Sequence, residues 1–157
     1  MDGTRQTGRE AAVVILAAGK GTRMRSEIPK VLHPIGNAPM LHHAMLAARG
    51  LGPRRSAVVV GHGADAVGAA ARAFDPEAVV AVQERQLGTG HAVLAARAAL
   101  DGFQGDLFVL FGDTPFLRPE TLDAMRLERD GADIVVLGFE AAEPGRYGRL
   151  LTDSDGM

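Results

Sequence analysis

Residues 12–24 read AVVILAAGKGTRM, a continuous apolar run that ends in a glycine-rich turn with basic residues. An apolar run without polar alternation is typical of a strand that is buried on both faces of a parallel sheet. Gly19 and Gly21 allow backbone amides to approach a ligand closely, and basic side chains beside them can offset phosphate charge. The stretch therefore predicts an α/β fold with a candidate binding loop after its first strand.

Further valine-rich runs continue this pattern along the chain. Strands are expected at residues 12–17, 56–60, 78–82, 106–111 and 133–139. Helical spacing or helix-forming composition predicts helices at 40–49, 65–74, 89–100 and 119–129. Alternating strands and helices predict a parallel sheet that helices cover on both faces. Ligands of such sheets bind at the carboxyl ends of strands, so the loops after the runs are the places to search.

Length, charge and composition argue against several classes of protein function. A chain of 157 residues suits one domain, and the net charge of −2 argues against a nucleic-acid-binding surface. The absence of cysteine excludes disulfides, a zinc-thiolate site and a cysteine nucleophile. No apolar run approaches the roughly 18 residues of a membrane helix, and residues 1–10 suggest a disordered polar tail rather than a signal peptide. We therefore expect a cytoplasmic protein that binds neither membrane nor nucleic acid, with its domain at 11–157.

The glycine-rich loop fits neither of two common phosphate-binding motifs. The dinucleotide-binding fingerprint needs a third glycine where Met24 stands. The P-loop needs Ser or Thr after its lysine, but Gly21 follows Lys20, and Val14 and Ile15 occupy the upstream positions. The basic residues beside the glycines favour phosphate binding. A tight turn that serves only the fold is the alternative.

Residues 16–24, LAAGKGTRM, are followed by PKVLH at 29–33. Together they resemble the signature of the sugar-phosphate nucleotidyltransferases. These two motifs are most similar to those of the uridyltransferase domain of the bifunctional bacterial enzymes that make UDP-N-acetylglucosamine. This resemblance implies a Rossmann-like three-layer fold with a mostly parallel sheet, incomplete at the C-terminus. It also implies Mg²⁺ as cofactor, and the transfer of uridylyl from UTP to N-acetylglucosamine 1-phosphate with release of pyrophosphate.

In that reaction a sugar 1-phosphate oxygen attacks the α-phosphorus of UTP, and the protein supplies positioning and charge stabilisation. The resemblance implies that Arg23 holds the β and γ phosphates and that Lys30 stabilises charge on the α-phosphate. It further implies that the first loop contributes the nucleotide-binding residues Leu16, Ala17, Ala18, Gly19, Gly21 and Thr22.

A second motif, QERQLGTGHA at 83–92, follows the third predicted strand. An amide side chain beside a glycine-rich turn suits recognition of a base edge, because it offers both a donor and an acceptor. A helix-capping turn explains the same residues equally well. The resemblance implies that Gln83 and Gly88 contact uracil and that Gln86 and Thr89 also belong to the nucleotide site.

The fourth predicted strand ends in FGDTP at 111–115. A carboxylate at the carboxyl end of a strand can hold Mg²⁺ against phosphate oxygens, although a lone aspartate before proline more often caps a turn. The motif resembles the Gly-Asp-x-Pro of the family, which implies that Asp113 is a metal ligand.

The sequence RYGR at 146–149 resembles a family segment in which the second glycine lies against the sugar, which implies a sugar-binding role for Gly148. Arg146 stands where the family has glycine, and an exposed hairpin turn is the alternative. The histidines lack metal-ligand spacing, so we expect structural or surface roles for His33, His42, His43, His62 and His91.

The resemblance extends from Val13 to Arg149, whereas the family's transferase domain continues beyond Met157. Further sugar-binding residues, a second metal ligand and the domain that trimerises full-length relatives all lie in that continuation. We therefore expect a fragment that binds UTP weakly and turns over poorly or not at all. The alternatives are another sugar-1-phosphate nucleotidyltransferase and a non-catalytic nucleotide-binding module.

Overall fold

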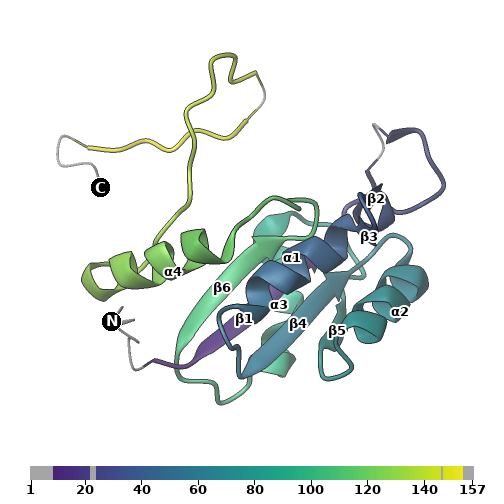
Figure 1. The fold of residues 1–157 in the computed structure, drawn as a ribbon, viewed down its shortest axis with the longest axis horizontal. Coiled ribbons are helices and arrows are strands. Elements are labelled where there is room, and N and C mark those ends of the chain that lie inside the picture. The colour runs from purple at the N-terminus through teal and green to yellow at the C-terminus, as the bar shows by residue number, and fades with distance from the viewer. Residues whose placement is uncertain (1–8, 22–23, 146, 154–157) are drawn as a thin grey trace.

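The computed structural model describes residues 9–21, 24–145 and 147–153. Its main sheet has four strands in the order β5-β4-β1-β6, and every neighbouring pair is parallel. The strands are β1 (Ala11–Ala17), β4 (Arg55–Val60), β5 (Val79–Val82) and β6 (Asp106–Phe111). Figure 1 shows β1 between β4 and β6, so the strand that leads into the glycine-rich loop lies inside the sheet.

Helices connect the parallel strands. They are α1 (Met40–Arg49), α2 (Ala64–Phe74), α3 (Thr89–Ala95) and α4 (Pro119–Glu128). The 3₁₀ turns with defined bounds in the described ranges are η2 (Lys30–Leu32), η3 (Arg97–Leu100) and η4 (Arg129–Gly131). The short strands β2 (Pro34–Ile35) and β3 (Ala38–Pro39) pair in a small hairpin. The helix predicted at 89–100 is thus divided into α3 and η3, and the other predicted helices agree within one residue.

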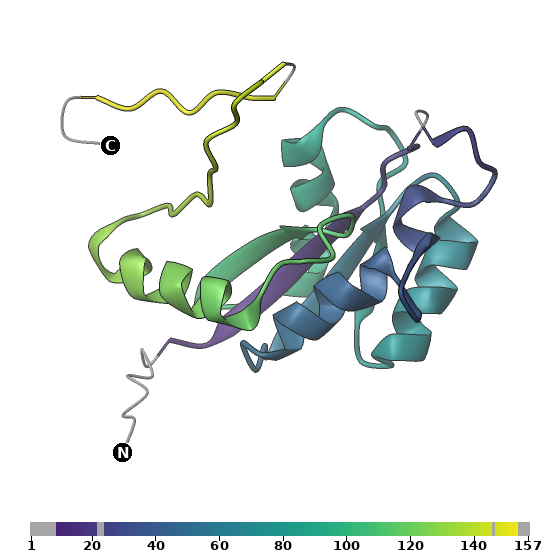
Figure 2. The ribbon, with the colours of Figure 1, turned by 45° about the horizontal axis from the view of Figure 1, so that its top comes forward.

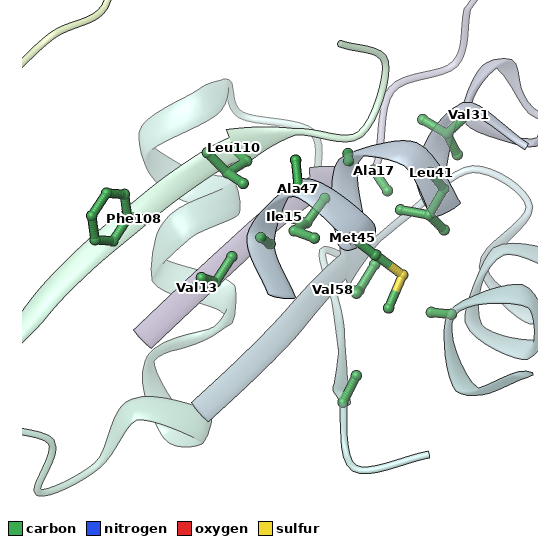
Figure 3. Packing of buried hydrophobic residues seen from close by; sticks show 14 of the residues in the cluster. Val13, Ile15, Ala17, Val31, Leu41, Met45, Ala47, Val58, Phe108 and Leu110 are labelled. Carbon is green, nitrogen blue, oxygen red and sulfur yellow. The ribbon is translucent and has the colours of Figure 1, made fainter. Parts of the chain in front are cut away.

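The core has two parts because side chains of a strand alternate between the faces of a sheet. Val13, Ile15 and Ala17 of β1 point to one face, where α1, α2 and α4 cover them. Val14 points to the other face and packs with Ala92 of α3. Figure 3 shows the larger cluster, in which α1 lies over the side chains of β1, β4 and β6.

Helices therefore lie on both faces of the parallel sheet, as Figure 2 shows. The predicted three-layer α/β class with a mostly parallel sheet is confirmed. Within the described ranges, no helix combines the length and the apolar character that a membrane span needs.

The prediction of a strand at residues 133–139 is wrong. The structure shows no regular secondary structure there, and Ile134 and Phe139 are 79% and 72% exposed. Figures 1 and 2 show this part of the chain leading away from the sheet. An apolar run becomes a strand only where a neighbouring strand pairs with its backbone, and composition alone does not supply that neighbour.

The predicted N-terminal tail lies largely outside the described residues, since positions 1–8 are not among them. At its described end, the carbonyl of Glu10 accepts a hydrogen bond of 2.9 Å from the backbone amide of Asp106. The side chain of Glu10 pairs with Arg54. Residue 10 is therefore attached to the start of β6 in this structure.

Candidate active site

A cavity of about 690 Å³ lies at the carboxyl ends of β1 and β6. Its volume is in the range that small-molecule ligands occupy. It brings together, from three separate loops, the predicted site residues Leu16, Ala17, Ala18, Gly19, Gly21, Lys30, Gln83, Gln86, Gly88, Thr89 and Asp113. Thr22 and Arg23, which were also predicted, lie outside the described residues.

The loop after β1 packs closely on the segment that carries Lys30. Gly21 has a φ of +57°, and a Cβ atom placed on it would lie 2.6 Å from the Cβ of Lys30. A side chain at this position would therefore meet both an unfavourable backbone conformation and a steric overlap. Glycine at position 21 allows the loop to lie against Lys30, the first residue of η2.

Lys30 and Asp113 form an ion pair that links η2 to the segment after β6. The Nζ of Lys30 lies 2.6 Å from the Oδ2 of Asp113, and the two side chains are 38% and 33% exposed. Lys30 begins η2, 13 residues after the end of β1, and Asp113 lies two residues after the end of β6. The ion pair thus joins two residues that are 83 positions apart in the chain.

The residues present fit a divalent cation of the magnesium type. In the described part of the chain no three His, Cys, Asp or Glu side chains are grouped as a metal cage. Asp113 contributes one carboxylate to the cavity. Mg²⁺ is usually bound through one or two carboxylates, with substrate phosphates and water supplying the other ligands. A single carboxylate opposite a glycine-rich loop matches that mode of binding.

The loop after β5 reaches the same cavity. The backbone amide of Gln83 donates to the carbonyl of Val60 at 2.8 Å, and the side chain of Gln83 is buried. Its Nε2 lies 3.1 Å from the carbonyl oxygen of Gly88 and 3.0 Å from the Nδ1 of His91. The Nε2 of Gln86 donates to the carbonyl of Ala18 at 2.7 Å, which joins this loop to the first one.

Gly88 ends that loop in a conformation that other residues rarely adopt. Its φ is +99° and its ψ is −178°, a region that is essentially restricted to glycine. α3 begins at the next residue, Thr89. The chain can therefore turn from the loop directly into the helix while Gly88 and Thr89 both line the cavity.

Sequence reasoning missed four apolar residues of the lining. Met24, Val31, Ala92 and Phe111 also line the cavity. They stand within or beside the quoted motifs, which was the available signal. Apolar side chains carry no chemistry of their own, so residue type did not mark them as site residues.

Gly148, the predicted sugar-binding residue, does not line this cavity. It lies in the exposed stretch after η4, where a Cβ atom added to it would meet nothing within 4 Å. Nearby, the guanidinium of Arg149 donates to the carbonyl of Gly145 at 3.3 Å. Arg146 lies outside the described residues, and the role of Gly148 stays a prediction.

Several histidines contact backbone carbonyls, consistent with the structural or surface roles expected of them. The Nε2 atoms of His33, His42 and His43 lie 3.2, 2.9 and 2.8 Å from the carbonyl oxygens of Ile28, Ala70 and Ile35. His91 differs from these three, because its ring contacts the side chain of Gln83 in the cavity wall.

Comparison with known proteins agrees with this geometry. The chain is 62% identical over 146 residues to the protein named "Bifunctional protein GlmU" of Ruegeria pomeroyi, covering 93% of this chain and 32% of that protein. Among solved structures, HddC from Yersinia pseudotuberculosis, complexed with GMP-PN, is 27% identical with a TM-score of 0.68, over 92% of this chain and 65% of that one. Rv0371c from Mycobacterium tuberculosis H37Rv is 29% identical with a TM-score of 0.63, over 80% and 62% of the two chains.

This chain spans about a third of the length of the curated relatives it matches. The family described as the MobA-like NTP transferase domain matches residues 13–152. The resemblance to nucleotidyltransferases is therefore confirmed over nearly the whole sequence. The chain belongs to the MobA-like NTP transferase domain family.

Proposed function

We propose that this chain provides the nucleotide site of an enzyme that transfers uridylyl from UTP to N-acetylglucosamine 1-phosphate. The observation that carries the proposal is the cavity in which a glycine-rich loop, a buried amide and the Lys30–Asp113 pair meet. The chain is 62% identical to the protein named "Bifunctional protein GlmU". This identity supports the choice of these substrates over those of other sugar nucleotidyltransferases.

In the proposed site the triphosphate lies along the loop that contains Gly19 and Gly21. Around Gly19 there is open space, since a Cβ atom there would meet nothing within 4 Å. Lys30 stabilises the charge that grows on the α-phosphate during attack by the sugar phosphate. The resemblance of the first loop to the family assigns Arg23 to the β and γ phosphates.

Asp113 is the proposed ligand of Mg²⁺, which neutralises phosphate charge when it is bound. Because Lys30 and Asp113 lie 2.6 Å apart, a cation held by Asp113 and the ammonium group of Lys30 would act on the same phosphate group. The Rv0371c protein has also been solved as a complex with manganese, at 29% identity and a TM-score of 0.56, which supports a divalent cation in a related protein. In the proposed site the base lies beside Gln83 and Gly88, in the loop after β5 that lines the same cavity.

The position of Gly148 favours a second candidate, nucleotide binding without transfer. The described residues that we propose for the nucleotide line one cavity, while the residue proposed for the sugar lies elsewhere in the described chain. A chain with this arrangement binds UTP but does not hold the acceptor for attack.

Calorimetric titration of the chain with UTP, CTP and dTTP in the presence of Mg²⁺ tests the nucleotide site. Pyrophosphate release after addition of N-acetylglucosamine 1-phosphate then tests transfer. We expect UTP to bind more tightly than CTP. Binding without pyrophosphate release would select the second candidate. If a chain shown to be folded by circular dichroism bound none of the three nucleotides, the proposed function would be wrong.

A further inference from the structure

The side-chain amide of Gln83 donates both of its hydrogens within the protein. Its Nε2 lies 3.1 Å from the carbonyl oxygen of Gly88 and 3.0 Å from the Nδ1 of His91. Gln83 is only 5% exposed, so these contacts occur away from bulk water and hold the amide in one orientation.

The chemistry of the two partners determines which end of the amide they face. A backbone carbonyl can only accept a hydrogen bond, so the atom of Gln83 beside the Gly88 carbonyl must be the nitrogen. The same nitrogen then donates its second hydrogen to the Nδ1 of His91. This requires a neutral imidazole that carries its proton on Nε2, because Nδ1 must offer a lone pair.

The oxygen of the same amide is left for a ligand. Among the hydrogen bonds of the described residues, none uses the Oε1 of Gln83, and Gln83 lines the cavity. The amide group therefore offers the cavity an acceptor and no free donor. This differs from an unrestrained glutamine, which can rotate its amide to match either kind of group.

We propose that His91 is a positioning residue that sets base selectivity, by holding Gln83 as a hydrogen-bond acceptor toward the nucleotide. A base with an imino N3–H, such as uracil or thymine, can donate to the Oε1 of Gln83. Cytosine presents an unprotonated N3 at the corresponding position, so two acceptors would face each other. The inference rests on the proposed function, because it assumes that a pyrimidine nucleotide lies beside Gln83.

Two substitutions distinguish the effect of the hydrogen-bond acceptor of His91 from the effect of its side-chain volume. His91→Leu removes the acceptor, and the amide of Gln83 then keeps one hydrogen bond and can present its nitrogen to a base. His91→Asn keeps an acceptor, because the Oδ1 of asparagine lies at the same bond separation from Cβ as the Nδ1 of histidine. Asparagine is therefore the matched control, which should retain the selectivity of the parent chain.

The experiment measures dissociation constants of UTP, dTTP and CTP for the parent chain and both variants. We expect the preference for UTP over CTP to fall about tenfold in His91→Leu, the value of one hydrogen bond in a site of this kind, and to persist in His91→Asn. The ratio of UTP to dTTP should stay constant, since both bases carry N3–H. A general destabilisation of the fold would lower the affinity for all three nucleotides together and would leave the UTP-to-CTP ratio unchanged.

A second readout needs no nucleotide. Long-range ¹H–¹⁵N spectra of the parent chain report which ring nitrogen of His91 carries the proton, and we expect the Nε2–H form. If the proton lies on Nδ1, or if His91→Leu keeps the UTP-to-CTP ratio of the parent, the inference is overturned while UTP binding stands. If the folded parent binds no pyrimidine nucleotide, the proposed function fails as well. Should His91→Leu fail to fold, His91→Gln replaces it, since its carbonyl lies one atom further from the backbone and should also lose the selectivity.

Discussion

Replacing Gly21 by alanine tests the packing between the first loop and Lys30. Gly21 has a φ of +57°, and the added Cβ atom would lie 2.6 Å from the Cβ of Lys30. Gly19 in the same loop has open space in place of such a contact, and its φ lies outside the left-handed region. The variants Gly21→Ala and Gly19→Ala therefore add the same methyl group at two positions, and only the first is expected to destabilise the fold.

The magnitude has two parts. A residue with a Cβ atom in the left-handed region costs about 1–2 kcal/mol. Carbon atoms in contact usually lie about 3.5–4.0 Å apart, so the 2.6 Å approach also requires a displacement of about 1 Å. We therefore expect Gly21→Ala to lower the free energy of unfolding by at least about 1–2 kcal/mol, equivalent to a fall in Tm of about 2–8 °C for a chain of this size.

Urea unfolding followed by circular dichroism measures both variants against the parent chain. Gly19→Ala is expected to leave the free energy of unfolding within about 1 kcal/mol of the parent, or to raise it slightly by restricting the unfolded chain. The reasoning is refuted if Gly21→Ala is as stable as the parent. It is also refuted if both variants lose the same free energy, because the loss would then not arise from contact with Lys30.

Two further substitutions probe the ion pair and the core. Lys30→Met frees Asp113 from a half-exposed ion pair worth about 1 kcal/mol, so the affinity for Mn²⁺ without nucleotide should rise up to about fivefold by calorimetry. Lys20→Met removes the same charge from the exposed loop and is the control; equal affinities in the two variants would contradict the pairing. Leu122→Ala empties a site that is 0% exposed in the core under α4, and should cost about 2–5 kcal/mol in urea unfolding. Leu127→Ala on the same helix, where the side chain is 51% exposed, should cost less than half as much, and similar losses would show that α4 does not pack as described.

The parts of the fold that could be predicted from sequence are those governed by local composition. The valine-rich runs of β1 and β4 are buried inside a parallel sheet, where no polar alternation is needed. The runs of β5 and β6 form the outer strands of the described sheet, and Val79 and Phe111 are among their residues that stay exposed. Because the carboxyl ends of parallel strands share one edge, the predicted loops after the first, third and fourth runs converge on one cavity.

The remainder depended on contacts that composition does not encode. Residues 133–139 have the same apolar character as the true strands, yet no strand pairs with them in the described structure. His91 was interpreted as structural or surface, since an isolated histidine has no signal of its own. Its contact with Gln83 arises because the turn at Gly88 brings the start of α3 back toward the end of β5.

The route by which the loop after β5 reaches the cavity explains why a glycine, Gly61, follows β4. β4 lies between β1 and β5 in the sheet, yet none of its described residues lines the cavity. The chain after β5 crosses the end of β4, where Gln83 donates to Val60, and Gln86 then reaches Ala18 at the end of β1. At Gly61, the residue after β4, there is no space for a side chain, since a Cβ atom on it would lie 3.0 Å from both the Cβ and the carbonyl oxygen of Ala18. The residues proposed to contact the base therefore follow an outer strand of the described sheet, and glycine at position 61 leaves the space beside Ala18, the residue whose carbonyl accepts the hydrogen bond from Gln86.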